Sequence, residues 1–265
     1  MPLKPVTLIT GASAGIGEAF ARLFAARGHD CALVARRADR LNALADGIAA
    51  AGQPRPHVLA ADLGTRDGLL RVAQNLAERE LEPAIVVNNA GFGLYGPAAD
   101  LDRASELAMV DLNVRVLTDF SLRFVGSLAR HRGGVINIAS MAAFFPGPSM
   151  AVYFATKAYV LSFSEALHAE LKPRGVRVTA VCPGPVLTEF QARAGLDERL
   201  PKFSAVSAER VARVAYDGFM RGKRVVVPGL VNKLNMMVPR LLPRGVVLRM
   251  VADYQRKVAR PAKPA

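Results

Sequence analysis

The chain has 265 residues, 51% of them hydrophobic, which is enough for a sizeable core, but length alone does not separate one α/β domain from two small ones. Two cysteines and four scattered histidines lack zinc-ligand spacing, and no uninterrupted apolar run reaches the ~20 residues that a membrane-spanning helix needs. The net charge of +13 is uneven: eleven Lys/Arg and one acid, Asp253, lie from Arg221 onward, whereas the rest carries 24 basic and 21 acidic residues.

The first residues pass almost directly into an apolar run, without a charged leader or a small-residue cleavage site. We therefore expect a cytoplasmic protein. Cys31 and Cys182 each lie within a strand-like apolar run, and we expect both to be reduced, buried thiols.

Short apolar runs alternate with helical patterns along the chain. Residues 6–10 predict a buried strand, and residues 16–27 predict a helix that stops at Gly28. A second strand over residues 31–35 and an Ala/Leu-rich helix from about residue 39 to 51 follow. Five further strands are predicted over residues 58–61, 84–87, 135–138, 176–181 and 224–227.

Strands that are apolar on both faces and separated by helices are typical of a parallel sheet covered on both sides. Right-handed crossovers then give an α/β fold of the Rossmann type, a doubly wound sheet of seven parallel strands with helices on both faces. The chain has no internal repeat and no low-complexity linker before the tail. We predict a single domain, with the Rossmann fold over residues 1–228 and a basic, partly helical extension over residues 229–265.

A glycine-rich turn, Thr-Gly-Ala-Ser-Ala-Gly-Ile-Gly over residues 10–17, joins the first strand to the first helix. Gly11 permits a tight turn, Gly15 lets the backbone approach a pyrophosphate, and Gly17 lets the helix pack closely on the strand. Ser13 and Ile16 belong to the same turn. The free amides and the helix dipole face the anion, so the turn predicts a dinucleotide site.

The residue that contacts the ribose of the dinucleotide is expected about 20 residues later, at the tip of the second strand. An acid there would bind the 2′-hydroxyl of NAD, but this strand ends Ala35-Arg36-Arg37. Two guanidiniums suit a 2′-phosphate by charge and by fork geometry. The alternative is a pair of solvated residues at a helix start, where cations are disfavoured. We predict NADP(H) rather than NAD.

Other unusual segments also stand at strand ends. They are Asn88-Asn89-Ala90-Gly91 after the fourth strand, Ser140 after the fifth, Tyr153 to Lys157 at the start of the following helix, and Pro183-Gly184 after the sixth. Open α/β sheets bind ligands at the carboxyl ends of their strands, near the point where strand order reverses. The sequence therefore predicts one site at this edge.

Together these motifs resemble those of the short-chain dehydrogenase/reductase family. A Thr-Gly-x-x-x-Gly-x-Gly turn, Asn-Asn-Ala-Gly, a serine thirteen residues before Tyr-x-x-x-Lys, and Pro-Gly-x-x-x-Thr ending at Thr188 occur in order. The resemblance covers Val6 to about Val227. It implies an oxidoreductase that interconverts a carbonyl and an alcohol with a nicotinamide cofactor.

The resemblance also implies roles for individual residues. The catalytic residues would be Asn113, Ser140, Tyr153 and Lys157. Asp62 and Leu63 would contact the adenine, and Asn89, with Ala90 and Gly91, the ribose region. Thr188, after Pro183 and Gly184, would contact the nicotinamide amide, and Tyr153 and Lys157 would contact the cofactor as well. The tyrosine motif reads Ala-Thr-Lys rather than the commoner Ala-Ser-Lys, a difference that we expect to be silent.

Physical chemistry supports the roles of the tyrosine and the lysine. A free tyrosine, with a pKa near ~10, is a poor acid–base catalyst at neutral pH. Lys157 lies one helical turn after Tyr153, so its ammonium is expected to lower the pKa of the tyrosine, as an oxidised nicotinamide would. Ser140 can hydrogen-bond the substrate oxygen where negative charge develops. The alternatives are a solvated tyrosine–lysine pair and, for Asn113, a structural asparagine in an apolar helix.

Apolar segments border the expected site. Residues 141–146, Met-Ala-Ala-Phe-Phe-Pro, follow Ser140, and four large apolar residues lie in the loop after Pro183-Gly184, where such folds often carry a lid: Phe190, Leu196, Leu200 and Phe203. They predict either a pocket for an aliphatic or aromatic ketone, or ordinary core or a subunit contact.

The basic tail departs from a minimal reductase of this family. Pro243 predicts the first turn of a helix, with Arg244, Arg249, Arg256 and Lys257 around the sides away from one apolar face. That face carries Val247, Met250, Val251, Tyr254 and Val258. Such a helix suits an anionic membrane surface, an acidic carrier protein or coenzyme A phosphates, or else packs on a neighbouring subunit. The tail resembles that of reductases related to long-chain 3-oxoacyl reductases.

We therefore predict that NADPH reduces a hydrophobic ketone, with a 3-oxoacyl chain as one candidate, in a homodimer or homotetramer. The alternative is a non-catalytic NADP-binding sensor on the same fold, which would not need Tyr153 with Lys157 and Ser140. We expect no metal site. We expect no specific nucleic-acid partner either, because no recognition motif or interleaved aromatics accompany the basic tail.

Overall fold

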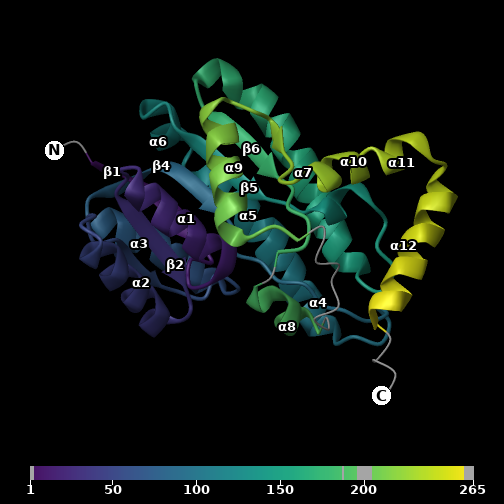
Figure 1. Ribbon diagram of the computed structural model, residues 1–265. Helices are drawn as coiled ribbons and strands as arrows, with labels where there is room; N and C mark the ends of the chain where they lie inside the picture. Colours follow the sequence, from purple (N-terminus) through teal and green to yellow (C-terminus); the bar gives the residue numbers. More distant parts are fainter. Residues whose placement is uncertain (1–2, 187, 196–204, 260–265) are drawn as a thin grey trace.

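The computed structural model describes residues 3–186, 188–195 and 205–259. A parallel sheet of seven strands in the order β3-β2-β1-β4-β5-β6-β7 forms its centre (Figure 1). The strands are β1 (Lys4–Thr10), β2 (Cys31–Ala35), β3 (His57–Ala60), β4 (Leu81–Asn88), β5 (Gly134–Ile138), β6 (Arg177–Val181) and β7 (Val225–Val226). The predicted doubly wound fold is confirmed.

Helices connect the strands and continue after the last one. They are α1 (Gly15–Ala26), α2 (Ala38–Ala50), α3 (Arg66–Glu78), α4 (Arg103–Val110), the π-helical turn η1 (Asp111–Val116), α5 (Leu117–Arg123), α6 (Val125–Arg130), the 3₁₀ turn η2 (Met141–Phe144), α7 (Ala151–Leu171), the 3₁₀ turn η3 (Lys172–Arg174), α8 (Glu189–Ala194), α9 (Ala208–Met220), α10 (Leu230–Asn235), α11 (Val238–Leu241) and α12 (Arg244–Ala259).

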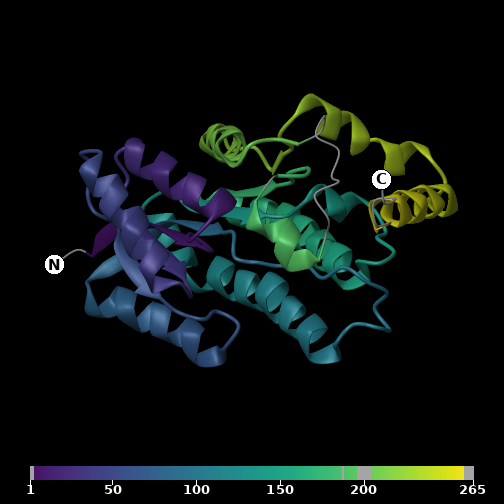
Figure 2. The ribbon, with the colours of Figure 1, turned by 60° about the horizontal axis from the view of Figure 1, so that its bottom comes forward.

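Helices cover both faces of the sheet because successive strand residues point to opposite sides. In β1, Ile9 faces a core layer built with α1, α2 and α9, whereas Leu8 faces a layer built with α3, α5, α6 and α7. Figure 2 shows the purple α1 and the green α9 on one side of the sheet and the blue α3 on the other. Strand residues are therefore apolar on both faces, as the sequence pattern indicated.

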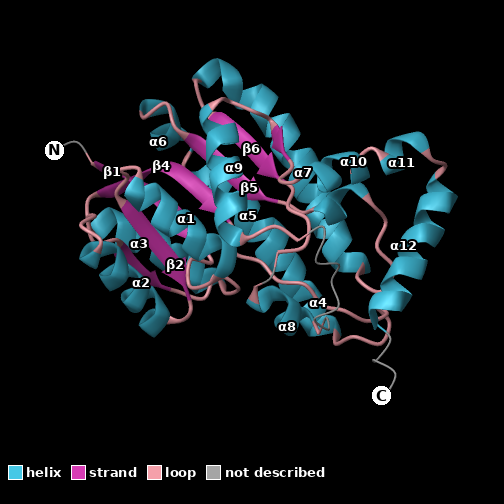
Figure 3. Cartoon of the chain, viewed as in Figure 1, coloured by secondary structure: helices cyan, strands magenta, loops and turns pink. Residues whose placement is uncertain are grey.

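The strand order reverses beside β1, which pairs with β2 on one side and with β4 on the other. The connections after β1 and β4 leave in opposite directions at this point and open a crevice at the carboxyl edge of the sheet. Figure 3 shows the strands as a single twisted layer between the helices. This reversal determines where the site lies.

Strand ends differ from the predictions by a few residues. The fourth strand begins at Leu81 rather than at residue 84, because Lys4 and Pro5 of β1 extend the pairing. Pro83 interrupts the apolar pattern, and the structure accommodates it at a shift in register. The seventh strand shortens to Val225–Val226.

Both cysteines are free and buried, as predicted, and burial raises the pKa of each thiol to about 12. No helix in the described part of the chain is long and apolar enough to cross a bilayer.

The tail forms three helices, α10, α11 and α12, which lie beside the carboxyl edge of the sheet (Figures 1 and 2). The last helix begins at Arg244, one residue later than predicted, because the Pro243 carbonyl accepts the amides of Val246 and Val247. Val247 is buried and Val251 is half-buried, whereas Met250 and Tyr254 are 49% and 43% exposed. The predicted apolar face is therefore only partly covered, and the side chain of Val258 lies outside the described residues.

Candidate active site

A cavity of about 950 Å³ lies at the carboxyl edge of the sheet, beside the reversal of strand order. It brings together residues from the ends of β1 to β6 and from α12. Of the residues predicted for the site, Gly17 and Asn113 do not line the cavity. The others line it: Gly11, Ser13, Gly15, Ile16, Arg36, Arg37, Asp62, Leu63, Asn89, Ala90, Gly91, Ser140, Tyr153, Lys157, Pro183, Gly184 and Thr188.

The glycine turn has the geometry that its sequence predicts. Gly11 and Gly15 adopt left-handed backbone conformations, with φ of +64° and +57°. A Cβ on Gly17 would collide with the Gly11 carbonyl and lie 2.6 Å from Asn89 Nδ2, so only glycine fits there. No side chain caps the start of α1, and its first amides therefore remain available to an anion in the cavity.

Thr10 and Asn89 hold this turn against the end of β4. The Thr10 hydroxyl accepts the amides of Asn89 and Ala90, each at 3.0 Å, and donates to the Val87 carbonyl. Asn89 Nδ2 donates to the carbonyls of Thr10 and Gly11 at 2.9 and 3.2 Å. Asn89, the second asparagine of the Asn-Asn-Ala-Gly segment, thus holds the glycine turn in place.

Arg36 and Arg37 lie at the tip of β2, as predicted, and both line the cavity. Arg37 donates to Ser13 Oγ at 3.1 and 3.3 Å and forms an ion pair with Glu189 at 2.8 Å. Arg40 binds the same carboxylate, and the two arginines lower the pKa of Glu189. The sequence showed no sign of Glu189, which stands 152 positions from Arg37.

Asp62 and Leu63 follow β3 and form the neighbouring wall. The Asp62 carboxylate accepts the Gly64 amide at 2.9 Å, and Leu63 is buried. This end of the cavity therefore has a buried apolar side chain, Leu63, next to the carboxylate of Asp62.

Tyr153 is buried at the other end of the cavity, with its ring 5.5 Å from the ring of Phe190. Burial raises the pKa of Tyr153 to about 12, and the nearby Ser140 hydroxyl opposes the increase. The expectation of a lowered tyrosine pKa is therefore wrong for the chain's own residues, because desolvation outweighs the hydrogen bond with Ser140. These residues hold Tyr153 as a neutral phenol.

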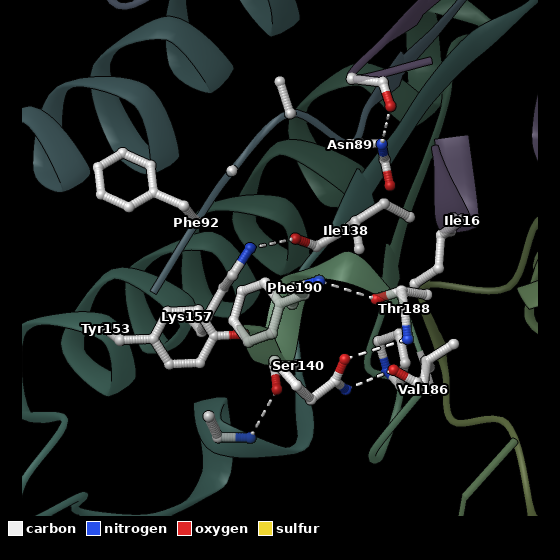
Figure 4. A pocket seen from close by; sticks show the side chains of 18 of the residues that line it. Ile16, Asn89, Phe92, Ile138, Ser140, Tyr153, Lys157, Val186, Thr188 and Phe190 are labelled. Carbon is white, nitrogen blue, oxygen red and sulfur yellow. Dashed lines mark hydrogen bonds between the residues drawn. The ribbon is translucent and has the colours of Figure 1, made fainter. Parts of the chain in front are cut away.

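Lys157 lies one turn after Tyr153 on α7, with Nζ 5.8 Å from the tyrosine ring centroid. The ammonium donates to the Ile138 carbonyl at 2.8 Å, at the end of β5 (Figure 4). Burial lowers the pKa of Lys157 to about 8. A solvated tyrosine–lysine pair is excluded, since both side chains are buried.

Asn113 lies in the π-helical turn η1, where the widened backbone turns its side chain toward the loop after β4. Its Oδ1 accepts the Phe92 amide at 3.1 Å, and its Nδ2 donates to the Phe92 carbonyl at 2.9 Å and to Thr156 Oγ1 at 3.2 Å. Thr156 in turn donates to the Tyr153 carbonyl. Asn113 thus joins the loop after β4 to the turn that carries Tyr153.

Ser140 and the segment after β6 complete the wall. Ser140 Oγ accepts the Ala142 amide at 3.1 Å, and the Met141 amide donates to the Pro183 carbonyl at 2.8 Å. Thr188 lies against Gly15, where its methyl group would be 3.0 Å from an added Cβ. In Figure 4, Ser140, Tyr153 and Lys157 gather on one side, opposite Ile16 and Asn89.

Both interpretations of the apolar segments hold in part. Met141, Ala142, Phe145 and Phe190 line the cavity, whereas Ala143 and Phe144 pack against the core. Leu196, Leu200 and Phe203 lie outside the described residues.

Several lining residues were missed by the sequence analysis. Phe92, Met150 and Phe154 line the cavity around Tyr153. Four residues of the predicted tail face, Val247, Met250, Val251 and Tyr254, also reach it. Their helical spacing was visible, but spacing does not tell what a face contacts. Within the described chain, no group of three His, Cys, Asp or Glu side chains is placed to hold a metal ion.

Comparisons with known proteins agree with this geometry. Residues 5–199 match the model of the short chain dehydrogenase family. The chain is 36% identical over 200 residues to sulfoacetaldehyde reductase 2 of Chromohalobacter salexigens, covering 74% of this chain and 79% of that protein. It is 29% identical over 266 residues to the very-long-chain 3-oxoacyl-CoA reductase of Anas platyrhynchos, covering 95% and 80% of the two chains.

Two solved structures are similar over nearly the whole chain. A short-chain dehydrogenase from Sphingobium yanoikuyae in complex with NADPH has 33% identity and a TM-score of 0.78, covering 98% of both chains. The bulky-bulky ketone specific alcohol dehydrogenase of Comamonas testosteroni has 30% identity and a TM-score of 0.74, covering 100% of this chain and 98% of the other. With the family model matched and the sheet, turn and cavity in place, the chain belongs to the short-chain dehydrogenase/reductase family, whose members are oxidoreductases acting between alcohols and carbonyls.

Proposed function

We propose that the protein is an NADP(H)-dependent reductase of hydrophobic ketones or aldehydes, with Tyr153 as its general acid–base residue. The observation that carries this proposal is the position of Tyr153. It is buried at the apolar end of the cavity, beside Ser140 and one helical turn from Lys157, while the opposite end carries the glycine turn and two arginines.

The residues at the turn fit a dinucleotide. Gly11 and Gly15 have the left-handed backbone that such a turn requires, and Gly15 and Ile16 line the cavity at an uncapped helix start. Asp62 and Leu63 would hold the adenine, Asn89 to Gly91 the adjoining ribose region, and Pro183 to Thr188 the nicotinamide. When bound, the nicotinamide supplies or accepts the hydride.

Arg36 and Arg37 would hold the 2′-phosphate of NADP. Arg37 is already oriented by Ser13 and Glu189, and a dianionic phosphate would compete with Glu189 for the same guanidinium. The Sphingobium relative contains NADPH, which supports the preference for NADP over NAD.

In the reductive direction, Tyr153 donates its phenolic proton to the carbonyl oxygen of the substrate. Its pKa of about 12 keeps it in the form that can donate. The Ser140 hydroxyl donates a hydrogen bond to the same oxygen as negative charge develops. Lys157 supports the phenolate that remains, because its ammonium lies 5.8 Å from the tyrosine ring. Asn113 acts as a positioning residue, through Phe92 and Thr156.

The walls around Tyr153 favour an apolar substrate. They are built from Met141, Phe145, Met150, Phe154 and Phe190 and from the inner side of α12. Among the lining residues that the structure describes, the cations are Arg36, Arg37 and Lys157, and the two arginines lie at the ribose end. Near Tyr153, the lining cation for a small anionic carbonyl, such as the one in the name of the Chromohalobacter relative, would be Lys157 alone, which already donates to the Ile138 carbonyl.

A panel of carbonyl compounds tests the proposal. Reduction by NADPH is followed through loss of reduced-cofactor absorbance with short, medium and long 2-ketones, aryl ketones, a 3-oxoacyl thioester and sulfoacetaldehyde. We expect KM to fall by up to about fourfold for each methylene that the apolar wall covers. Turnover confined to small polar carbonyls would overturn the apolar-substrate assignment, and equal use of NADH would overturn the cofactor assignment.

A further inference from the structure

The three tail helices expose an unusual amount of apolar surface. We call residues 230–257, which comprise α10, α11 and most of α12, the C-terminal arm. Of the 17 large hydrophobic side chains that are exposed in the described structure, ten lie in this arm, and two of these ten, Met250 and Tyr254, line the cavity. Scattered exposed hydrophobic residues are ordinary, but a concentrated patch marks a contact surface.

The first two helices of the arm are oriented with their apolar side outward. Leu230, Leu234 and Leu241 are 73%, 65% and 75% exposed. Leu230 and Leu234 lie one turn apart on the same face of α10, and Leu241 ends α11. On the opposite side Asn232 is only 2% exposed and donates to the Pro228 carbonyl at 2.8 Å. The helix therefore buries its asparagine against the body and presents its leucines outward.

The positive charge of the arm indicates which kind of partner covers its exposed leucines. The described arm carries six basic side chains, Lys233, Arg240, Arg244, Arg249, Arg256 and Lys257, and one acid, Asp253, which pairs with Arg256. A second copy in a twofold contact would place this positive surface against itself. An anionic surface is complementary to it.

We propose that the arm docks the protein on an anionic lipid bilayer. The exposed leucines of α10 and α11 enter the boundary between headgroups and acyl chains, and the surrounding Lys and Arg side chains contact acidic headgroups.

The opposite side of the arm belongs to the cavity. Val247, Met250, Val251 and Tyr254 of α12 line it, and the Tyr95 hydroxyl donates to the Gln255 carbonyl at 3.0 Å, which attaches α12 to the loop after β4. A bilayer under the arm lies next to the apolar end of the site, so a lipophilic carbonyl reaches Tyr153 directly from the lipid. This last step rests on the proposed function, whereas the docking does not.

Vesicle flotation of the full chain tests the docking without any catalytic measurement. The probes are vesicles of phosphatidylcholine alone and of phosphatidylcholine with about one third phosphatidylglycerol, at low and at high salt. We expect flotation with the anionic vesicles at low salt only. The variant Leu230→Ser/Leu234→Ser/Leu241→Ser should bind at least about tenfold more weakly, because it removes the inserted side chains.

Matched controls separate the arm from general surface properties. Leu3→Ser/Leu70→Ser changes two exposed leucines outside the arm, and should float like the parent. Lys233→Gln/Arg240→Gln should weaken binding by about fivefold for each cation removed. Thermal unfolding of each variant shows that its fold is kept.

Three results would overturn the proposal. In the first, the parent chain fails to float with anionic vesicles, and binding to an acidic carrier protein would then assign the face to that class of partner. In the second, the triple serine variant floats as well as the parent. In the third, the triple variant changes the oligomeric mass in light scattering, which would assign the face to a second copy. Loss of ketone reduction with flotation intact would instead count against the proposed function alone.

Discussion

Burial determines the protonation of the two central side chains. The chain holds Tyr153 neutral, with a pKa of about 12, and lowers the pKa of Lys157 to about 8. Because Lys157 is charged below this value and neutral above it, support for a phenolate is present at neutral pH and is lost as the pH rises. The pair therefore suits proton donation near neutrality.

This arrangement predicts a pH profile. We expect log kcat/KM for ketone reduction to be flat at lower pH and to fall with an apparent pKa near 8, as Lys157 loses its proton. Initial rates with saturating NADPH, measured in overlapping buffers, provide the profile. A rate that rises through this range would show that the ammonium is not required.

Arg37 should discriminate between the two nicotinamide cofactors. Arg37→Gln removes a guanidinium that lines the cavity, so we expect the Kd of NADPH to rise about tenfold or more, with the Kd of NADH nearly unchanged. Arg40→Gln is the matched control, because Arg40 shares Glu189 but does not line the cavity. Fluorescence titrations measure both constants. Equal losses for NADPH and NADH, or equal effects of the two substitutions, would refute the assignment of the ribose site.

The role of a single residue could be predicted from the sequence where the backbone conformation restricts the residue type. Gly11 and Gly15 have the left-handed backbone that favours glycine, and Gly17 allows an approach that a side chain would block. The direction of the Tyr153 pKa was not predictable, because spacing places Lys157 one turn away but does not reveal how much water both side chains lose. The Glu189 partner of Arg37 depends on tertiary structure alone.

The glycine turn is the element whose packing is most restrictive. Gly17→Ala places a methyl group against the Gly11 carbonyl and Asn89, so we expect a loss of roughly 2 kcal/mol in the free energy of unfolding, or several degrees in Tm. Gly47→Ala is the control. In α2 its Cβ meets nothing nearer than Arg22 at 3.8 Å, and it should stabilise by about 0.4–1 kcal/mol. Thermal unfolding compares them, and an unchanged Tm for Gly17→Ala would contradict the packing described.

Secondary structure followed from periodicity wherever an element is buried on both sides. All seven predicted strands exist, because a buried parallel strand produces a continuous apolar run. Ends were less accurate, as at β4, where pairing with β1 carries the strand through Pro83. The π-helical turn at Asn113 has no sequence signature, and the partner of its side chain, Phe92, lies 21 positions away.

The tail helices lie between the exposed surface of the protein and the cavity that holds Tyr153. The sequence predicted a basic amphipathic helix but left its contacts open, because helical spacing does not identify the neighbour of a face. In the structure α12 forms a wall of the cavity while α10 and α11 direct leucines outward. The domain boundary at residue 228 and the dimer or tetramer stay predictions.

The wall formed by α12 predicts a change in chain-length preference. Met250→Ala removes apolar surface from the cavity, so we expect KM for long-chain ketones to rise several-fold, with short ketones unaffected. Val246→Ala, on the same helix but outside the cavity lining, is the control. Steady-state kinetics across the ketone series provides the test. A uniform change at all chain lengths, or the same change in the control, would contradict a substrate contact.

Proton transfer by Tyr153 is measured with the variant Tyr153→Phe in a single turnover with bound NADPH. The substitution removes one hydroxyl from a buried ring and leaves the turn and the arginines in place. We predict that the rate of NADPH oxidation by a hydrophobic ketone falls by about 10²–10⁴-fold while the Kd of NADPH stays within about twofold. Full reductase activity in this variant would show that Tyr153 does not transfer the proton and would favour a protein that binds the cofactor without using this residue.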